Sequence, residues 1–409
     1  SPTFFETIII SRVSAGGGGG RSFIAGYDEF NGRLLWQWFS VPPSGGDPEW
    51  DFKDAAKGNI NPYPGDWGEN DLIGGGSIFS LVAVDESTGI IYFPTGAPAL
   101  AYDASLRPGP NLYSNSIVAL DANTGKMIWY HQTTPHDING HEPARSLILA
   151  NATINGEERK VILASTKGDY AYVLDAATGE LLHNPISFGA QKISAYNTNQ
   201  GNNADMNLSQ DVLEGNDYCP GAFGGAASTS AFADNTFFIA SQNYCSKFNA
   251  GQIPYKEKLI NGFQIEPSLA GQSSTVHAID VSTGQIKWTF PIESRYQGGI
   301  TVSGGVVYLV DISGNFYALD SETGDVLKKI PMNGAGNTGV TIASDANGDM
   351  RLFVATGGSK SGIITALGLP EESTADNDGI SRRGIIGSLA LTSIVGILYL
   401  AFLRFYRKN

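Results

Sequence analysis

The segment ALDANTGKMIW, residues 119–129, carries the pattern on which the fold depends. An apolar run leads into Asp-x-x-Thr-Gly, and a second apolar alternation follows it. The Asp side chain can accept hydrogen bonds from backbone N–H groups two residues further on. The Gly supplies the positive φ that closes a hairpin with a bulge. The segment therefore predicts one antiparallel β-hairpin.

The same hairpin pattern occurs six times along the chain of 409 residues. Its Asp residues lie 57, 36, 54, 105 and 40 residues apart, and a propeller blade of four strands takes roughly 40–50 residues. Two weaker copies, ASTSAFADNTFFIAS (227–241) and MRLFVATGGSKSGIITALGL (350–369), bring the count to seven or eight. We therefore expect an all-β protein, a β-propeller of seven to eight four-stranded antiparallel blades, rather than an array of β-sandwiches. The Asp residues of the six copies are Asp28, Asp85, Asp121, Asp175, Asp280 and Asp320.

Three tryptophans, Trp36, Trp129 and Trp288, occupy the same place in three of the copies. A large aromatic side chain that recurs at one position of a repeat is buried where neighbouring repeats meet. We therefore expect these tryptophans to pack between blades rather than to stack on a ligand.

The net charge of the chain indicates which class of partner it lacks. The chain has 26 Lys and Arg against 40 Asp and Glu, a net charge of −14. A nucleic-acid-binding surface would be basic, so we expect no nucleic-acid partner.

Asn151 and Asn207 begin Asn-x-Ser/Thr sequons, which are candidate glycosylation sites if the body lies outside the cytoplasm.

Residues 384–403, GIIGSLALTSIVGILYLAFL, contain no charged side chain. About 20 apolar residues cross the core of a bilayer as a helix. Two arginines precede the stretch and three basic residues follow it, which favours a cytoplasmic tail over residues 404–409. We expect a single-pass protein of the cell membrane with its body outside the cytoplasm; a buried core helix is the alternative.

The expected domain order follows from the repeat and this apolar stretch. Residues 1–367 form the propeller, and residues 368–383 form an acidic polar linker. One C-terminal transmembrane helix and the short tail come after the linker.

Three longer phrases are more specific than the repeat. They are LRPGPNLYSNSIVALDANTGKMIWYHQTTPHD (106–137), CPGAFGG (219–225) and ASQNYC (240–245). With the Asp-x-x-Thr-Gly repeat, they resemble the pyrroloquinoline quinone (PQQ) dehydrogenases, eight-bladed quinoprotein alcohol dehydrogenases, over residues 1–370. The resemblance implies a disulfide between Cys219 and Cys245, and hence an oxidising compartment. It also implies that the N-terminal part of the propeller is missing from this chain.

The resemblance further implies where a cofactor would sit. In the family, PQQ lies on the propeller axis beside Ca²⁺ or a lanthanide, which acts as a Lewis acid, and an Asp accepts the proton of the alcohol. In TTPHDINGHEPA (133–144), Gly140 matches that Asp, and Glu142 stands where lanthanide-type enzymes add another Asp. Ala97 matches an Asn ligand, and a Glu ligand falls in SAGGGGGRSF (14–23). These replacements predict no metal ion.

A few residues remain as candidates for a site. Lys167 matches a base that contacts the quinone, and Phe79 lies near the position of an apolar floor under it. Asp137 and Glu142 are the fallback catalytic residues. Otherwise, we expect His136 and Asp137 to be structural; a new metal site formed by His136, His141 and Glu142 is the other possibility.

The replacements favour a degenerate site with no catalytic residue and no cofactor. On this hypothesis the protein is not an enzyme but a binding or scaffolding subunit, with protein partners in a membrane or surface assembly. The alternative is an active PQQ-dependent alcohol or aldehyde dehydrogenase, with calcium or a lanthanide, that passes electrons to a membrane acceptor.

Overall fold

The computed structural model describes residues 2–14, 20–42, 66–68, 73–80, 82–99, 104–189, 217–221, 223–249, 264–267, 272–358 and 361–368. Every regular element in these ranges is a β-strand, so the all-β prediction is confirmed. The chain divides into two compact units, Ser1–Glu293 and Ser294–Asn409.

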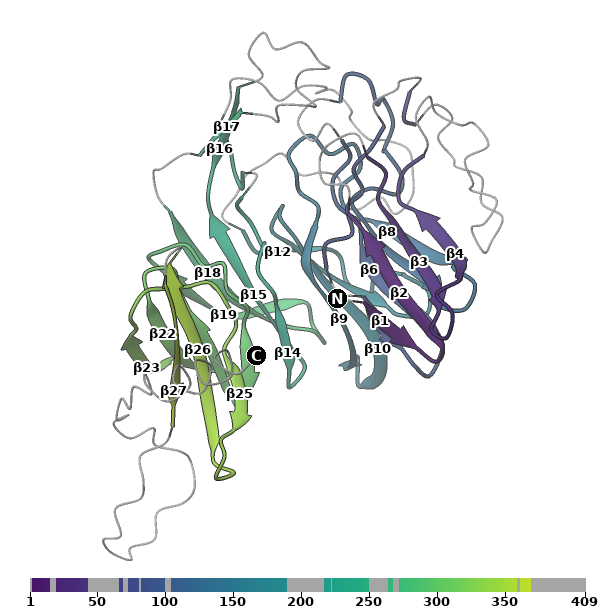
Figure 1. Cartoon of the computed structure of the whole chain (residues 1–409). Coiled ribbons are helices and arrows are strands. Elements are labelled where there is room, and N and C mark those ends of the chain that lie inside the picture. The colour runs from purple at the N-terminus through teal and green to yellow at the C-terminus, as the bar shows by residue number, and fades with distance from the viewer. Residues whose placement is uncertain are drawn as a thin grey trace, which may run out of the picture. The chain divides into compact units, whose positions relative to one another are not determined.

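The first unit contains four four-stranded antiparallel sheets, coloured purple to green in Figure 1, and one three-stranded sheet. The first two sheets follow the chain: β1 (Thr3–Phe5), β2 (Ile8–Val13), β3 (Phe23–Asp28) and β4 (Leu34–Phe39), then β5 (Ala83–Asp85), β6 (Ile90–Pro94), β7 (Ser116–Asp121) and β8 (Met127–Gln132). The third contains β9 (Pro143–Ile154), β10 (Glu157–Thr166), β11 (Tyr170–Asp175) and β12 (Ile186–Ser187). The fourth contains β14 (Ala231–Ala233), β15 (Thr236–Asn243), β18 (Ser273–Asp280) and β19 (Gln285–Ile292), and the three-stranded sheet pairs β13 (Asp217–Tyr218), β16 (Ser246–Asn249) and β17 (Gln264–Pro267).

The second unit contains two four-stranded sheets. One contains β20 (Thr301–Ser303), β21 (Val306–Val310), β22 (Asn315–Asp320) and β23 (Val326–Pro331). In the other, the long strand β26 (Met350–Gly358) pairs with β24 (Ala335–Gly336), β25 (Thr341–Ser344) and β27 (Ser361–Leu367).

Six four-stranded sheets in the described ranges are fewer than the seven to eight blades expected. The reason lies in the second and fourth sheets, each of which contains two of the counted copies; the fourth holds both the weaker copy at 227–241 and the Asp280 motif. In the second sheet, Asp85 lies at the turn between the first two strands, and Asp121 at the turn between the last two. One turn chemistry thus serves two positions within a sheet, so counting motifs overestimates the number of sheets.

The predicted turn chemistry is confirmed at all six motif positions. At Asp121, Oδ1 accepts from the backbone N–H groups of Asn123 (2.9 Å) and Thr124 (2.8 Å). Gly125 N then donates to Asp121 O at 2.8 Å with φ of +69°, a conformation that favours glycine. The other motif glycines share this bond and a positive φ: Gly32, Gly89, Gly179, Gly284 and Gly324.

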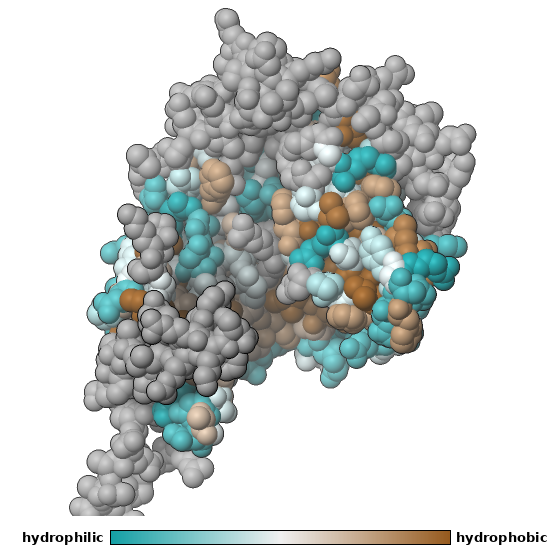
Figure 2. Space-filling view, viewed as in Figure 1, coloured by the Kyte–Doolittle hydropathy of each residue, from teal (hydrophilic) through white to brown (hydrophobic). Residues whose placement is uncertain are grey.

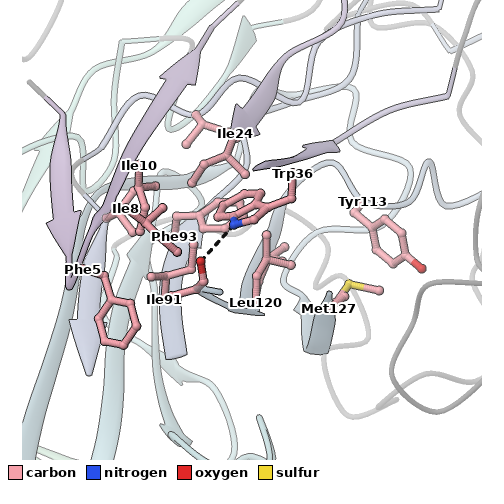
Figure 3. Packing of buried hydrophobic residues seen from close by; sticks show 14 of the residues in the cluster. Phe5, Ile8, Ile10, Ile24, Trp36, Ile91, Phe93, Tyr113, Leu120 and Met127 are labelled. Carbon is pink, nitrogen blue, oxygen red and sulfur yellow. Dashed lines mark hydrogen bonds between the residues drawn. The ribbon is translucent and has the colours of Figure 1, made fainter. Parts of the chain in front are cut away.

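Trp36 and Trp129 join neighbouring sheets through these turns, as predicted. Trp288 on β19 is buried, and its ring lies 5.9 Å from that of Phe238 in its own sheet. Trp36 Nε1 on β4 donates to Ala122 O in the turn of the second sheet at 2.9 Å (Figure 3). Trp129 Nε1 on β8 donates to Ala176 O in the turn of the third sheet at 3.0 Å. A Cβ added to Gly179 would lie 2.5 Å from the Trp129 ring, so the ring rests directly on the turn.

Apolar clusters fill the spaces between successive sheets. The cluster in Figure 3 joins the first two sheets and includes Ile10, Ile24, Phe93 and Leu120. A second cluster joins the second and third sheets, and a third joins the third and fourth sheets. The four four-stranded sheets of the first unit therefore pack in order, each against the next along the chain. In the second unit, one cluster joins its two sheets.

The first sheet also has apolar side chains on its other face. The strand register places Phe4, Ile9, Tyr27 and Leu34 in one row across β1 to β4. Phe4 is 58% exposed and Leu34 48% exposed. Figure 2 shows apolar residues mixed with hydrophilic ones over this region. The sheet thus buries one face and leaves apolar groups at the surface on the other.

Two histidines within the sheets predict a dependence of stability on pH. Burial lowers the pKa of both His131 and His277 to about 4, from 6.5. The unfolded chain therefore binds more protons between pH 6.5 and 4, and the free energy of unfolding falls as the pH falls through this window. A shift of this size corresponds to about 3 kcal/mol per histidine. Urea unfolding of His277→Gln and the wild type at several pH values should show that the variant loses less stability on acidification; parallel curves would contradict the assignment.

The expected membrane helix and tail, and the linker after residue 368, lie outside the described residues. Among those described, no helix is long and apolar enough to span a bilayer.

Candidate functional site

The candidate residues lie at the strand ends opposite the Asp turns. In the second sheet, the Asp121 turn follows β7, whereas the segment between β6 and β7 lies at the other end. In the third sheet, Glu142 directly precedes β9 and Lys167 directly follows β10. Since β9 and β10 are antiparallel neighbours, these two residues come from the same end of their sheet.

Backbone hydrogen bonds connect this end of the second sheet through successive loops. Gly96 N donates to Ser77 O at 2.7 Å, Asn115 N to Gly96 O at 2.9 Å, and Thr133 N to Asn115 O at 2.8 Å. Asn115 Nδ2 then donates to Asp137 Oδ2 at 2.7 Å, which ties the loop before the third sheet to the second sheet.

The carboxylate of Asp137 is fully buried and organises the loop that leads to Glu142. Its Oδ1 accepts from Asn139 N (2.8 Å) and Gly140 N (3.0 Å). Its Oδ2 accepts from His141 N (2.9 Å) in addition to Asn115. Four donors thus engage the carboxylate, so the geometry gives Asp137 the part of a loop organiser.

The two histidines of the loop are also built into the protein. His136 Nδ1 lies 2.9 Å from Gly109 O. His141 is buried with Nε2 3.1 Å from Pro220 O, and its ring packs against Gly168. Burial lowers the pKa of His141, the nearby charge of Asp137 opposing it. Within the described ranges, no three His, Cys, Asp or Glu residues gather to hold a metal ion, so a site shared by His136, His141 and Glu142 is not formed there.

Glu142 and Lys167 form an ion pair that is largely enclosed. Lys167 Nζ lies 3.1 Å from Glu142 Oε1, and the two side chains are 13% and 15% exposed. Lys167 N also donates to Glu142 O at 3.1 Å. The second carboxylate oxygen, Glu142 Oε2, is buried and accepts no hydrogen bond. A buried carboxylate oxygen normally has a partner, so this atom is available for a ligand, a water molecule or a proton.

The loop that leads to the fourth sheet packs on Lys167. Gly225 has φ of +67°, and a Cβ there would lie 1.9 Å from Lys167 O. Only glycine fits this approach. A disulfide joins Cys219 of the same loop to Cys245, which follows β15, with Cα atoms 4.4 Å apart, so the predicted pairing is confirmed.

Loss of the disulfide should destabilise this loop and with it the Lys167 turn. Closing a loop of this length contributes about 3 kcal/mol in the chain-entropy account. We expect the double variant Cys219→Ser, Cys245→Ser to have a free energy of unfolding lower by that amount and to unfold at a lower urea concentration. Unfolding of the wild type with and without a reducing agent provides the matched comparison, and the double variant should not respond to the reductant.

Phe79 stands at the same end of the second sheet. Its ring is 54% exposed and lies against Gly96, where a Cβ would come within 3.0 Å of Cε2. The backbone carbonyl of Phe79 accepts a 3.5 Å hydrogen bond from Arg12. An exposed aromatic face that rests on a glycine is suited to support a flat ligand.

The positions at which the resemblance places ion ligands lack side-chain oxygens where the structure describes them. Ala97 O accepts from Gly76 N, and Gly140 N donates to Asp137. Residues 15–19, within the glycine-rich segment, lie outside the described residues. In the described part of this end, two buried carboxylate oxygens accept no hydrogen bond, Glu142 Oε2 and Asp169 Oδ2.

One residue of this region was missed by sequence reasoning. Asp169 is 2% exposed, with φ of +61°, and Ser241 Oγ on β15 donates to its Oδ1 at 2.6 Å. Burial raises the pKa of Asp169 to about 7. The signal was a carboxylate two residues after Lys167, but its burial depends on Ser241 and Gly189, which come from distant or later parts of the chain.

Of the two predicted glycosylation sites, one lies among the described residues. Asn151 lies on β9 with an exposed side chain, so a glycan could be accommodated there. Asn207 lies outside the described residues. Modification of either remains a prediction.

Two family models match parts of this chain. One, described as the glucose/ethanol/alcohol dehydrogenase β-propeller domain, covers residues 2–187. The other, a PQQ-type model described as outer membrane protein assembly factor BamB, covers residues 272–367.

Individual relatives extend the likeness over most of the chain. A lanthanide-dependent methanol dehydrogenase of Methylorubrum extorquens is 27% identical over 95% of this chain and 68% of its own length. A quinohemoprotein alcohol dehydrogenase of Comamonas testosteroni is 29% identical over 84% of this chain and 50% of its own. The crystal structure of the quinohemoprotein alcohol dehydrogenase from Comamonas testosteroni superposes with a TM-score of 0.73 and 26% identity, over 87% of this chain and 55% of that one. The chain thus spans about half to two thirds of the length of these relatives.

Proposed function

The chain belongs to the β-propeller family of the PQQ-dependent alcohol and methanol dehydrogenases, and we propose that it forms the propeller of a dehydrogenase that oxidises an alcohol or aldehyde with PQQ. The observation that carries the proposal is the enclosed Lys167–Glu142 pair with its free carboxylate oxygen, at the strand ends where the resemblance places the cofactor.

The expectation that no cofactor is bound is wrong. It rested on Gly140 and Ala97 at positions of the ion and of the proton acceptor. The relatives are a lanthanide-dependent methanol dehydrogenase and quinohemoprotein alcohol dehydrogenases, and they favour the dehydrogenase over the scaffold. The loss of side chains at those positions changes which residues do the work rather than removing the need for a cofactor.

The residues present fit the quinone. PQQ carries carboxylates and carbonyl oxygens on a flat ring system, so it requires a cation and an apolar surface. Lys167 supplies the cation, held in place by Glu142 and by its backbone contact with Gly225. Phe79 supplies an exposed aromatic face. The described residues offer no cluster of His, Cys, Asp or Glu ligands for an ion beside the quinone.

The chemistry assigned to the chain is the handling of one proton. Oxidation of an alcohol to a carbonyl removes two electrons with one hydrogen as hydride and releases the hydroxyl proton. Bound PQQ supplies the acceptor for the hydride. Glu142 Oε2 accepts the hydroxyl proton, because it is the free oxygen of a carboxylate whose other oxygen is held by Lys167. Lys167 orients this carboxylate through the ion pair.

The test is binding first and turnover second. Purified protein is titrated with PQQ, alone and with Ca²⁺ or La³⁺, and binding is followed by the absorbance of the quinone. Alcohol-dependent reduction of a dye is then measured. Lys167→Met should weaken quinone binding, whereas Lys160→Met removes an ion pair with Asp85 at the opposite strand ends and should bind normally. No quinone binding by the wild type under any of these conditions would end the proposal.

We also propose the location expected above: a membrane anchor at residues 384–403, with the body outside the cytoplasm and electrons passed to an acceptor in the membrane. The disulfide supports this location, because such bonds persist in oxidising compartments. Protease added to intact cells should cut the body, and a marker fused to the C-terminus should stay protected. Protection of the body would reverse the orientation.

A further inference from the structure

The turn that carries Lys167 is locked to the fourth sheet by a buried carboxyl group. Asp169 N donates to Thr166 O at 3.0 Å, which closes the turn, and Phe188 N donates to Asp169 O at 3.0 Å. Ser241 Oγ on β15 donates to Asp169 Oδ1 at 2.6 Å. The side chain of Asp169 therefore ties the turn between β10 and β11 to the neighbouring sheet.

The surroundings of this carboxyl group are close and uncharged. Its Oδ2 is buried without a hydrogen bond and lies against Gly189, where a Cβ would come within 2.2 Å of it. Ala226, whose backbone donates to this carboxyl group, belongs to the apolar cluster between the third and fourth sheets. Neither Ser241 nor Gly189 can neutralise an ionised carboxylate.

The titratable groups nearest to Asp169 either form an ion pair with another residue or are uncharged. On its own turn, Lys167 is paired with Glu142, which comes from the start of β9. His141 packs on Gly168, and His277 of β18 has its ring 5.1 Å from that of Phe188. Burial lowers the pKa of both histidines, so they carry no charge at neutral pH.

We propose that Asp169 is a positioning residue for Lys167, and that the position of Lys167 depends on whether Asp169 is protonated. The proposal rests on the proposed function in one respect, that Lys167 faces the quinone. Protonated Asp169 fits its uncharged surroundings and holds the turn closed. Ionised Asp169 places an unpaired charge in the interface between two sheets, which loosens the turn and moves Lys167 away from Glu142.

The pH at which this change occurs follows from burial. Burial raises the pKa of Asp169 to about 7, although Ser241 and the backbone of Ala226 oppose it by donating to the carboxylate. The folded protein therefore holds a proton that the unfolded chain releases near pH 4. Stability from this group is fully present below pH 4 and is lost as the pH rises to about 7, the reverse of the histidine effect.

The experiment measures the chemical reactivity of Lys167 on the protein alone, without quinone. A pulse of an amine-acetylating reagent is applied from pH 5 to 9, and labelling of each lysine is read by mass spectrometry. Lys160 serves as the internal reference, since its ion-pair partner Asp85 stays ionised throughout this range. In the wild type, the ratio of Lys167 to Lys160 labelling should rise several-fold across pH 7.

Three variants decide the outcome. Asp169→Asn keeps the shape and cannot ionise, so its ratio should stay at the low-pH value throughout. Asp169→Ala loses the lock, so its ratio should be high at every pH. Ser241→Ala removes the hydrogen bond that ties the turn to β15, so its ratio should already be raised at low pH. A rise near pH 7 that persists in Asp169→Asn would overturn the proposal, as would an unchanged ratio in Asp169→Ala that folds by circular dichroism.

This measurement separates the two proposals. If the wild type binds no PQQ but its labelling profile behaves as described, the proposed function fails and the positioning role of Asp169 stands. If the wild type binds PQQ and the labelling ratio is flat with pH, the reverse holds. If both hold, Asp169→Ala should weaken quinone binding, and Asp169→Asn should bind as well at pH 8.5 as at pH 6.

Discussion

Replacement of Glu142 by Gln should lower kcat of the loaded enzyme by about 10²–10⁴, the usual effect of removing a general base. Gln preserves the size of the side chain and can still accept from Lys167, but its amide cannot take up a proton. The free Oε2 atom becomes an amide oxygen or an NH₂ group in the same buried place. Initial rates of dye reduction over a range of alcohol concentrations measure kcat and KM separately, and we expect most of the loss in kcat.

The control is a second Glu-to-Gln substitution, at another position of the third sheet. Glu158 lies on β10 with its side chain exposed, so Glu158→Gln should turn over at the wild-type rate. Wild-type turnover by Glu142→Gln would assign proton acceptance to another group.

Replacement of Trp129 by Ala should lower the free energy of unfolding by about 3–5 kcal/mol, as expected for a large buried aromatic residue. The ring is 7% exposed, packs on Gly179 and lies 5.8 Å from the ring of Tyr92. Its removal opens a cavity between the second and third sheets and leaves Ala176 O without the indole donor. Urea unfolding followed by circular dichroism gives the difference in stability.

Two further variants separate the contributions. Trp129→Phe keeps most of the apolar area and loses the hydrogen bond, so it should cost about 1–2 kcal/mol. Phe30→Ala removes an aromatic residue that is 81% exposed at a turn of the first sheet, and should fall within about 0.5 kcal/mol of the wild type. Equal losses for Trp129→Ala and Phe30→Ala would mean that the tryptophan does not join the sheets.

The turns were predictable because their chemistry is local. Asp121, Thr124 and Gly125 satisfy one another within five residues, so the sequence alone specifies the hairpin. The number of sheets was not predictable from those turns. The Asp85 motif has the same local chemistry, but it joins the first two strands of a sheet rather than the last two, and only strand pairing distinguishes the cases.

In the site, too, the residues could be predicted from the sequence but the contacts between them could not. Lys167 and Glu142 were both singled out from the sequence, but their ion pair was not, because it arises from the antiparallel pairing of β9 with β10. Preference for Glu142 over Asp137 as proton acceptor also needed coordinates, since it depends on which carboxylate oxygens are already engaged. Asp169 escaped notice because its unusual surroundings come from β15 and from the segment after β12.

The tryptophan contacts and Asp turns lie at one end of the strands, and the Lys167–Glu142 pair lies at the other. Substitutions in the loops around Lys167 therefore leave the tryptophan contacts at the other end of the strands in place. The residues of these loops can change in evolution while the tryptophan contacts are kept, and they can be changed by mutagenesis in the same way. New loops grafted between β6 and β7, or between β8 and β9, would test how much foreign chemistry these sheets tolerate.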